Sequence, residues 1–362
     1  MDMNLQEKID SLPLSPGVYL MKDSRGGIIY VGKSKSLRKR VQSYFYNNKS
    51  HSPKVKKLVQ HVKDLDYRVT DTEFEAFMLE CQLIQTIKPM YNRKMKNPQS
   101  YSYIVVRESG GMRRLEVGNS IEAGANLVYF GPYTASRISV EKAIQGIQEC
   151  FKIACNSSSA NSTPCLNYSL GLCLGVCLGG EAVQEFNEIM DRLIALLGGS
   201  DQSLYEELEH KMLEASEQYD FEKAAKYRDC IESVKFLIDK EKVIDFAEQN
   251  HNIVMIEPLS DGEFKLFFVK SNNILYSEKY SVERSKSGTF MAEVQERILH
   301  YAEDDHEQQQ NAVRRDEIDT AQIIYSYLHH HNCRYMFIPQ EWLIEENHGE
   351  IESALRKLLS QN

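Results

Sequence analysis

Two tyrosine–glycine signatures near the amino terminus bring together residue types that could hold and hydrolyse a phosphodiester. They are Gly17-Val18-Tyr19 and Tyr30-Val31-Gly32; Lys33, Arg40 and a further phenol, Tyr44, follow the second one. Cleavage needs a base for the attacking water and positive charge that stabilises the transition state. A free tyrosine has a pKa of about 10, so a phenol could be that base near neutral pH only beside cations. The spacing therefore predicts a hydrolytic site built from phenols and cations.

A carboxylate later in the chain could bring a metal ion to this site. Glu80 is in line with Ala76, Leu83 and Ile87 on an expected helix, which places it within or beside an apolar seam. A carboxylate in such a seam is costly unless it is paired or binds a metal. Hard divalent ions often need only one or two carboxylates, so we expect Mg2+ or Mn2+ at Glu80. The alternative is that Glu80 lies at the edge of the seam and extends into water.

The elements that must position these residues follow from hydrophobic patterning. Residues 17–21 and 28–31 are β-branched and aromatic runs separated by a glycine-containing turn, so they predict a β-hairpin. Further elements are expected to be a helix over 36–45, a strand over 66–70 and a helix over 71–87. The last helix should end before Pro89, because the residue preceding a proline avoids helical geometry.

The charge of the chain is unevenly distributed. The 362 residues carry a net charge of −9, but residues 1–100 hold 18 Lys+Arg against 10 Asp+Glu. A basic head on an acidic body fits a head that meets phosphates, although a solvated charged surface would have the same composition. Mean hydropathy is −0.45, no run approaches the roughly 18 apolar residues of a membrane span, and the polar start is unlike a secretory signal. We therefore expect a cytoplasmic protein with no membrane partner.

Four of the eight cysteines are clustered. Cys155, Cys165, Cys173 and Cys177 are separated by nine, seven and three residues. In a cytoplasmic protein such a cluster favours a metal site over disulfides. The gaps are wide for a zinc ribbon, which favours pairs spaced by two to four residues, whereas four thiolates suffice for an iron–sulfur cluster. Four reduced cysteines packed in a small domain are the remaining alternative.

A helical hairpin is expected over 204–230. Apolar residues recur at helical spacing on both sides of Gln218-Tyr219-Asp220, and Asp220 is a suitable N-cap for the second helix. Two short helices gain stability by burying an apolar face against a partner. The candidate partner-binding residues are Leu208, Met212, Phe221, Ala225 and Arg228. The alternative is an ordinary hairpin packed on this chain's own core.

The whole pattern predicts an α+β, multi-domain protein. In the middle we expect strands over 102–106 and 113–117, a turn at Tyr129-Phe130-Gly131-Pro132-Tyr133, a helix over 136–150 and a flexible loop over 156–163. After residue 240 we expect strands over 253–256, 264–269, 274–276 and 335–338, with helices near 291–302, 315–329 and the end. The expected domains are a small α/β domain (1–98), a cysteine-rich helical linker domain (99–198), a helical hairpin (199–240) and a small C-terminal α/β domain (241–362).

The two signatures resemble those of the GIY-YIG nucleases. With Leu79-Glu80 and Pro89-Met90-Tyr91-Asn92, they are similar to the amino-terminal domain of the UvrC family, the nuclease subunits of bacterial excision repair. The resemblance implies that Tyr30 is the general base, that Tyr19 orients it or the phosphate, that Lys33, Arg40 and Tyr44 contact the phosphate or water, that Glu80 binds a single divalent ion, and that Asn92 supports the site. The chain departs from the family at Val18, normally Ile, and at Cys81-Gln82, normally a small residue and Asn.

The resemblance to this family extends beyond the first domain. The segment from Pro164 to Cys177 looks like its cysteine-rich region, which implies a [4Fe-4S] cluster rather than Zn2+. Residues 208–231 resemble the UVR motif, which implies docking on UvrB. The family continues into an RNase H-like second nuclease domain and a tandem helix-hairpin-helix, whereas this chain stops at Asn362. The segment 252–340 resembles only the part of the family that precedes that second nuclease.

The function expected from the resemblance is that of a truncated UvrC-like endonuclease. It would nick damaged double-stranded DNA presented by UvrB, on the 3′ side of the lesion. One alternative is a stand-alone auxiliary excision nuclease, although such proteins lack the UVR helices. Another is a non-catalytic adaptor that binds UvrB and competes with full-length UvrC.

Overall fold

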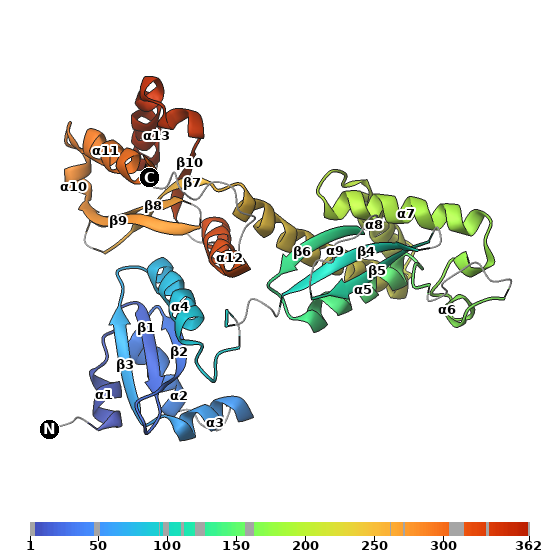
Figure 1. The fold of residues 1–362 in the computed structure, drawn as a ribbon, viewed down its shortest axis with the longest axis horizontal. Helices are drawn as coiled ribbons and strands as arrows, with labels where there is room; N and C mark the ends of the chain where they lie inside the picture. Colours follow the sequence, from blue (N-terminus) through green and yellow to red (C-terminus); the bar gives the residue numbers. More distant parts are fainter. Residues whose placement is uncertain are drawn as a thin grey trace. The chain divides into compact units, whose positions relative to one another are not determined.

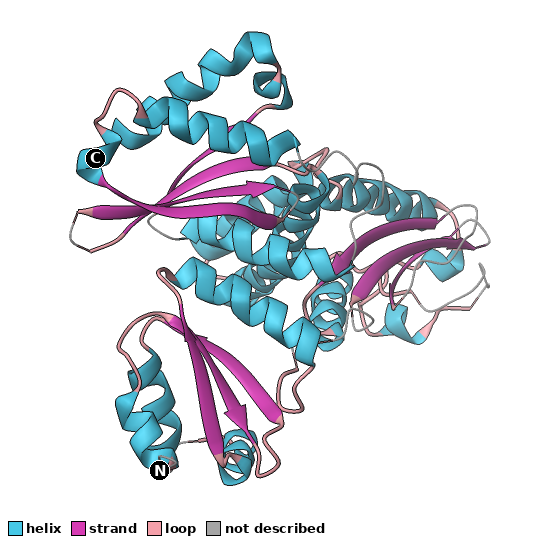
Figure 2. Ribbon diagram, turned by 60° about the vertical axis from the view of Figure 1, so that its left-hand side comes forward, coloured by secondary structure: helices cyan, strands magenta, loops and turns pink. Residues whose placement is uncertain are grey.

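The computed structural model describes residues 4–46, 51–93, 95–96, 101–109, 112–119, 127–155, 163–260, 262–270, 272–303, 315–330 and 333–360. The chain forms two compact units (Figure 1): unit 1 is Met1–Pro98 together with Phe246–Asn362, and unit 2 is Gln99–Asp245. Each unit combines helices with antiparallel sheet (Figure 2), which confirms the predicted α+β, multi-domain class. The division into four domains stays a prediction, and the grouping of residues 246–362 with 1–98 was not expected from the sequence.

The amino-terminal part of unit 1 is a three-stranded sheet with helices on both faces. Its strands, in the order β2-β1-β3, are β1 (Gly17–Lys22), β2 (Ile28–Ser34) and β3 (Asp64–Val69). Helix α4 (Glu73–Ile87) packs on Val18, Leu20 and Val31 of one face. The other face packs against α1 (Leu5–Ser11), α2 (Leu37–Tyr46) and α3 (Pro53–His61). The predicted hairpin, the helix after it, the strand and the helix ending before Pro89 are confirmed.

Two of these helices were not predicted, although the sequence carries a start signal for each. Asn4 and Glu7 form a reciprocal capping box at the start of α1. Ser52 caps α3, and Pro53 occupies its first turn, a position where the missing N–H of proline costs nothing.

The C-terminal part of unit 1 is a four-stranded antiparallel sheet in the order β10-β7-β8-β9. The strands are β7 (Asn252–Pro258), β8 (Glu263–Lys270), β9 (Asn273–Ser281) and β10 (Arg334–Ile338). Helices α11 (Phe290–Glu303) and α13 (His348–Ser360) cover the face that carries Val254, Leu266 and Phe268. On the opposite face, Tyr327 of α12 (Arg315–His330) donates a hydrogen bond to Glu257 of β7. The predicted strands and long helices of this region are confirmed.

Unit 2 packs helices on a second three-stranded sheet, in the order β5-β4-β6. Its strands are β4 (Ser102–Ser109), β5 (Met112–Gly118) and β6 (Leu127–Tyr133), and its main helices are α5 (Arg137–Cys150), α7 (Glu181–Leu197), α8 (Ser203–Glu217) and α9 (Phe221–Glu248), the last of which ends in unit 1. Helices α8 and α9 form the predicted hairpin. Asp220 caps α9 by accepting from the Lys223 N–H, as predicted.

The turn predicted at Tyr129–Tyr133 is wrong, because this segment is the second half of β6. Gly131 and Pro132 signal a turn in the sequence, but β6 is an edge strand, where the missing N–H of a proline is tolerated. The register of β4 against β6 shifts between Ser102 and Ile104 and absorbs the irregularity. Most of the expected 156–163 loop lies outside the described residues.

None of the helices in the described ranges is long and apolar enough to cross a membrane.

Candidate active site

The three tyrosines of the sequence motifs come together on one face of the amino-terminal sheet. We call Tyr19, Tyr30 and Tyr44 the tyrosine trio; their ring centroids lie 6.0 to 6.3 Å apart. The Tyr19 and Tyr44 hydroxyls share a hydrogen bond of 3.0 Å, and Tyr19 is only 1% exposed. The predicted clustering of the phenols is therefore present, with Tyr19 and Tyr44 buried and Tyr30 half-buried.

Gly32 is required by this packing. It pairs with Tyr19 across the β1–β2 hairpin. A Cβ atom at residue 32 would lie 2.3 Å from the Tyr19 hydroxyl oxygen. Only glycine at residue 32 therefore allows the Tyr19 phenol to lie across β2, which explains the glycine of the second motif.

Arg40 is the cation beside the tyrosine trio. It lies one turn before Tyr44 on α2, with its guanidinium carbon 5.2 Å from the centroid of that ring. Burial and the neighbouring Tyr44 raise the pKa of Tyr30, while the charge of Arg40 opposes the rise. Burial likewise raises the pKa of Tyr19, again against Arg40. Arg40 alone therefore does not lower the pKa of either phenol below its ordinary value.

Glu80 reaches the same edge of β2 from the opposite face of the sheet. Its Oε1 accepts a 3.1 Å hydrogen bond from the Lys33 N–H at the end of β2. Burial raises the pKa of Glu80, although the Lys33 N–H and the charges of Lys33 and Arg40 act to lower it. The negative charge of Glu80 contributes to the raised pKa of Tyr30. Carboxylate and phenols therefore share one electrostatic environment.

Lys33 does not point toward the tyrosine trio. Its Nζ lies 2.8 Å from Glu73 Oε1 and 3.4 Å from the centroid of the Phe77 ring, both on α4. Lys35 pairs with the other oxygen of Glu73, at 2.8 Å. A phosphate contact by Lys33 stays a prediction, and it requires the ammonium to leave Glu73. Nothing in the sequence pattern indicated Glu73, because its role depends on how α4 lies against β2.

Asn92 supports the strand that carries Tyr30. The buried Asn92 side chain accepts from the Val31 N–H and donates to the Val31 carbonyl, both at 2.9 Å. The Tyr91 N–H donates to the Ile29 carbonyl on the same edge. These bonds satisfy the outward-facing backbone groups of an edge strand, so Asn92 acts on the site through the main chain of β2.

Replacing Asn92 should therefore destabilise unit 1. In Asn92→Ala, two backbone groups of Val31 lose their partners, and each unsatisfied buried group costs about 1–3 kcal/mol. We expect the free energy of unfolding, measured by urea denaturation, to fall by about 2 kcal/mol or more. Gln82→Ala on the exposed side of α4 is the matched control. A loss in Asn92→Ala no larger than in that control would contradict this role.

The clustered cysteines lie together in unit 2. The sulfurs of Cys155, Cys165 and Cys173 all lie within 4.8 Å of one another. The Cys165 N–H donates to Cys177 Sγ at 3.3 Å. Burial acts to raise the pKa of Cys165, but the Tyr168 N–H and the Cys177 and Cys173 thiols lower it. A lowered thiol pKa favours the thiolate, which is the form that binds metals.

The candidate partner-binding residues of the hairpin divide into two groups. Leu208 lies in the core of unit 2 and is only 1% exposed, and its contact with a partner stays a prediction. Met212 and Ala225 are partly buried, whereas Arg228 is exposed. Phe221, at 65%, is exposed together with two residues that the sequence reasoning did not select, Leu213 (58%) and Tyr219 (80%).

Three family models match successive parts of the chain. Residues 15–93 match the UvrC-like GIY-YIG domain, residues 101–196 the UvrC/Cho excinuclease middle domain, and residues 202–235 the UvrB/uvrC motif. These matches cover the tyrosine trio, the cysteine cluster and the helical hairpin in that order.

Curated relatives match most of this chain. The UvrABC system protein C of Caldanaerobacter subterraneus subsp. tengcongensis is 37% identical over 290 residues, 78% of this chain and 47% of that protein. The protein of the same name from Alkaliphilus oremlandii is 33% identical over 351 residues, 95% of this chain and 51% of that protein. The chain thus spans about half the length of the curated relatives it matches.

The GIY-YIG endonuclease domain of Thermotoga maritima UvrC, solved with its catalytic magnesium, is 36% identical to this chain, covering 26% of this chain and 100% of that domain with a TM-score of 0.23. The order of the three family matches, together with the two relatives, identifies the whole architecture from the tyrosine motifs to the hairpin. The chain is therefore a UvrC-like member of the GIY-YIG proteins, with a UvrC-type middle domain and a UVR motif.

Proposed function

We propose that this chain is a metal-dependent DNA endonuclease of the nucleotide-excision-repair type, which nicks damaged double-stranded DNA 3′ to the lesion in partnership with UvrB. The observation that carries the proposal is the convergence of three phenols, Arg40 and Glu80 on one edge of β2. Phosphodiester hydrolysis needs a base, an electrostatic clamp and a metal ligand, and this set contains a candidate for each.

In this proposal, Tyr30 removes the proton from the attacking water. Of the two motif tyrosines on the sheet, Tyr30 is half-buried, whereas Tyr19 is buried and its hydroxyl is hydrogen-bonded to that of Tyr44. Tyr19 therefore orients the trio, and Arg40 and Tyr44 hold the phosphate or the water. Lys33 joins them when a phosphate competes with Glu73 for its ammonium.

The donor set around Glu80 fits a hard divalent ion. One oxygen of Glu80 accepts from the Lys33 N–H, and among the described residues no hydrogen bond or ion pair involves the other. Mg2+ and Mn2+ commonly bind through one or two carboxylates and keep several waters. When bound, such an ion would supply positive charge to the phosphate and lower the pKa of a coordinated water. Its charge would also offset the part of the raised Tyr30 pKa that comes from Glu80.

Docking on UvrB is proposed to use the tip of the α8–α9 hairpin. Leu213, Tyr219 and Phe221 expose large apolar surface there, and Tyr219 and Phe221 contact each other edge to face with centroids 6.2 Å apart. Exposed aromatic residues on a rigid element are frequent centres of protein–protein binding energy. The same tip would serve a non-catalytic adaptor equally well, so binding alone does not distinguish the two functions.

Phe221→Ala should weaken UvrB binding without weakening the fold. Because Phe221 is 65% exposed, its loss leaves the core intact, while removal of an interface aromatic typically costs about 2 kcal/mol or more. We expect the dissociation constant, measured by calorimetry, to rise at least about tenfold with an unchanged unfolding midpoint. Ile138→Ala, equally exposed at 65% on α5, is the control. Equal affinity of both variants and the wild type would remove the hairpin tip from the interface.

We also propose that the cysteine cluster binds a metal, as [4Fe-4S] with Zn2+ as the alternative. Three sulfurs lie within 4.8 Å of one another, and a fourth, Cys177 Sγ, accepts a hydrogen bond from the Cys165 N–H. Together they give the four ligands that either group requires. Iron and zinc analysis of anaerobically purified protein tests this, together with visible absorption. Protein that contains neither metal, and binds neither on reconstitution, would leave the cysteines as packed thiols.

The proposed nuclease function is tested by a nicking assay. Purified protein, Mg2+ or Mn2+, UvrA and UvrB should convert a lesion-bearing duplex into a product with one nick, 3′ to the lesion. Intact DNA under conditions in which the protein binds UvrB would instead establish the adaptor function.

A further inference from the structure

Helix α4 belongs to two cores at once. Toward the β1–β2 hairpin it buries Ala76, Leu83 and Ile84. On another side, Phe74 is fully buried against Phe267 of β8 and Tyr327 of α12, with ring centroids 5.3 and 5.0 Å away. Packed interiors transmit displacement because they contain few voids. A shift of residues 246–362 would therefore displace the helix that carries Glu80.

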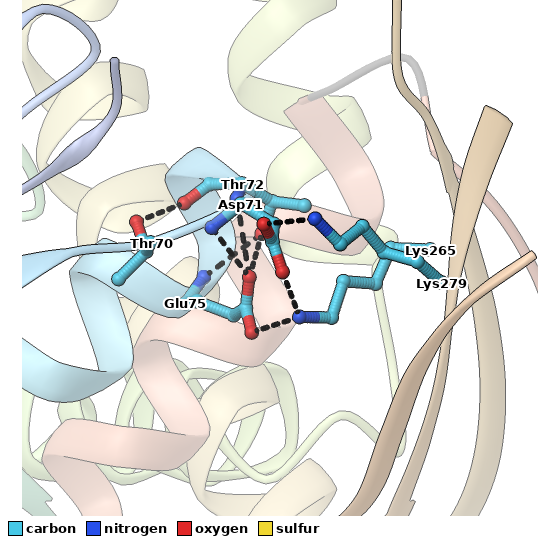
Figure 3. A network of polar contacts seen from close by, with 6 residues as sticks. All are labelled: Thr70, Asp71, Thr72, Glu75, Lys265 and Lys279. Carbon is cyan, nitrogen blue, oxygen red and sulfur yellow. Dashed lines mark hydrogen bonds and ion pairs between the residues drawn. The ribbon is translucent and has the colours of Figure 1, made fainter.

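A charged network joins the first turn of α4 to the C-terminal sheet (Figure 3). The Lys265 side chain is only 8% exposed, and its Nζ lies 2.6 Å from Asp71 and 2.6 Å from Glu75. Lys279 lies 2.7 Å from the other oxygen of Asp71. Burial opposes the charge of Lys265, but hydrogen bonds with the two carboxylates raise its pKa. The lysines lower the pKa of Asp71, against the effect of its burial. These shifts hold Lys265 and Asp71 in their charged forms.

Glu75 has a second task in the same turn. Its Oε2 accepts from the Asp71 and Thr72 N–H groups, and the Thr72 hydroxyl accepts from the Glu75 N–H, a reciprocal capping box. One carboxylate thus bridges the start of the helix and the buried lysine. A buried ion pair is weak evidence for net stability, but its need for one geometry suits it to fixing how the helix lies against the sheet.

The same turn is connected to the nuclease site. Glu73, which lies between Asp71 and Glu75 in the sequence, holds the Lys33 ammonium at 2.8 Å. The Lys33 N–H in turn donates to Glu80 Oε1, nearly two turns further along α4. Helix α4 therefore holds the end of β2 through two contacts of Lys33, one with its side chain and one with its main-chain N–H.

We propose that residues 246–362 are a built-in positioning element for the nuclease site. It acts through two positioning residues, Lys265 of that element and Glu73 of α4. Lys265 fixes the first turn of α4, Glu73 fixes the end of β2 on that turn, and together they set how Glu80 lies relative to the tyrosine trio. This inference rests on the nuclease function proposed above. Mutation of residues that support a metal ligand typically lowers metal affinity or activity by about 10- to 100-fold.

The test uses the full chain and two independent measurements. Hydrogen exchange of the α4 amides, in metal-free protein, reports whether the helix stays docked. The Mg2+ concentration that gives half-maximal nicking reports whether Glu80 stays in place. The variants are Lys265→Met, the milder Lys279→Met, whose side chain is 48% exposed in the wild type, and Glu73→Gln. Lys286→Met, on an exposed loop of the same unit, is the control.

We expect Lys265→Met to accelerate α4 exchange and to raise the Mg2+ midpoint by about 10-fold or more. Lys279→Met should do both to a smaller degree, which decides the question if Lys265→Met fails to fold. Glu73→Gln should raise the midpoint, and Lys286→Met should change neither measurement. Faster exchange with a wild-type midpoint, or unchanged exchange in both lysine variants, would overturn the proposal. If the wild type does not nick DNA, the nuclease function fails, and the exchange data still decide whether α4 is held by the two lysines.

Discussion

Tyr30→Phe should abolish nicking while leaving the protein folded. The substitution removes one hydroxyl, and with it the proposed base, from a ring that otherwise keeps its packing against Tyr19 and Tyr44. Loss of a general base typically slows the chemical step about 10²- to 10⁴-fold. Because the ring packing is kept, we expect any loss of stability to stay within about 1 kcal/mol. The measurement is the single-turnover nicking rate at saturating Mg2+ and UvrB.

The pH dependence of the rate sharpens this test. Because burial and Tyr44 raise the pKa of Tyr30, only a small fraction of the phenol is deprotonated near neutrality. The wild-type rate should therefore rise with pH from about 6 to about 9, and the residual rate of Tyr30→Phe should lose that dependence. Tyr67→Phe, an exposed tyrosine on β3, is the control and should behave as the wild type. A Tyr30→Phe variant with wild-type rate and pH profile would exclude Tyr30 as the base.

Much of the candidate site could be predicted because its residues are close in sequence and their elements have strong local signals. The hairpin that pairs Tyr19 with Gly32 and the helix that carries Arg40 and Tyr44 follow from alternation and helical spacing. Glu80 could be predicted because a carboxylate in an apolar seam is costly unless it is paired or binds a metal. In the structure, one of its oxygens is paired with the Lys33 N–H.

What the sequence could not show depends on packing between distant segments. Lys33 was expected to face the phosphate, but its direction is decided by Glu73 and Phe77, forty or more residues later. Leu208 and Phe221 have equally apolar side chains in the same hairpin, yet one is in the core and the other in solvent. Hydrophobicity alone cannot separate them, because this hairpin has apolar side chains both on the side that packs on the core and on the side that is exposed.

The C-terminal part of unit 1 shows the same limit at the level of whole elements. Its strands and helices have clear patterns, and nearly all of them were predicted. Its attachment to α4 depends on Lys265, a charged residue in a hydrophobic strand, facing two carboxylates nearly two hundred residues earlier in the chain. No local pattern indicates such a pairing.

Glu80→Gln should also abolish metal-dependent nicking, and it should do so without loss of stability. The amide keeps an oxygen that can accept from the Lys33 N–H, but it carries no charge for a divalent ion. We therefore expect that no practical Mg2+ concentration gives half-maximal nicking, and that the rate falls by about 10²-fold or more. Asp66→Asn, an exposed carboxylate on β3, is the control for loss of one negative charge.

The stability of the Glu80→Gln variant separates this explanation from simple damage to the fold. Because burial raises the pKa of Glu80, its carboxyl favours folding below its unfolded pKa of about 4.3, and that contribution is lost as pH rises through the folded pKa. A neutral amide avoids this loss, so at pH 7 the variant should unfold at the same urea concentration as the wild type or at a higher one. At low pH the difference should vanish. A clear loss of stability at pH 7 would mean that Glu80 holds the structure through its charge, and the loss of nicking could then not be assigned to a missing metal ligand.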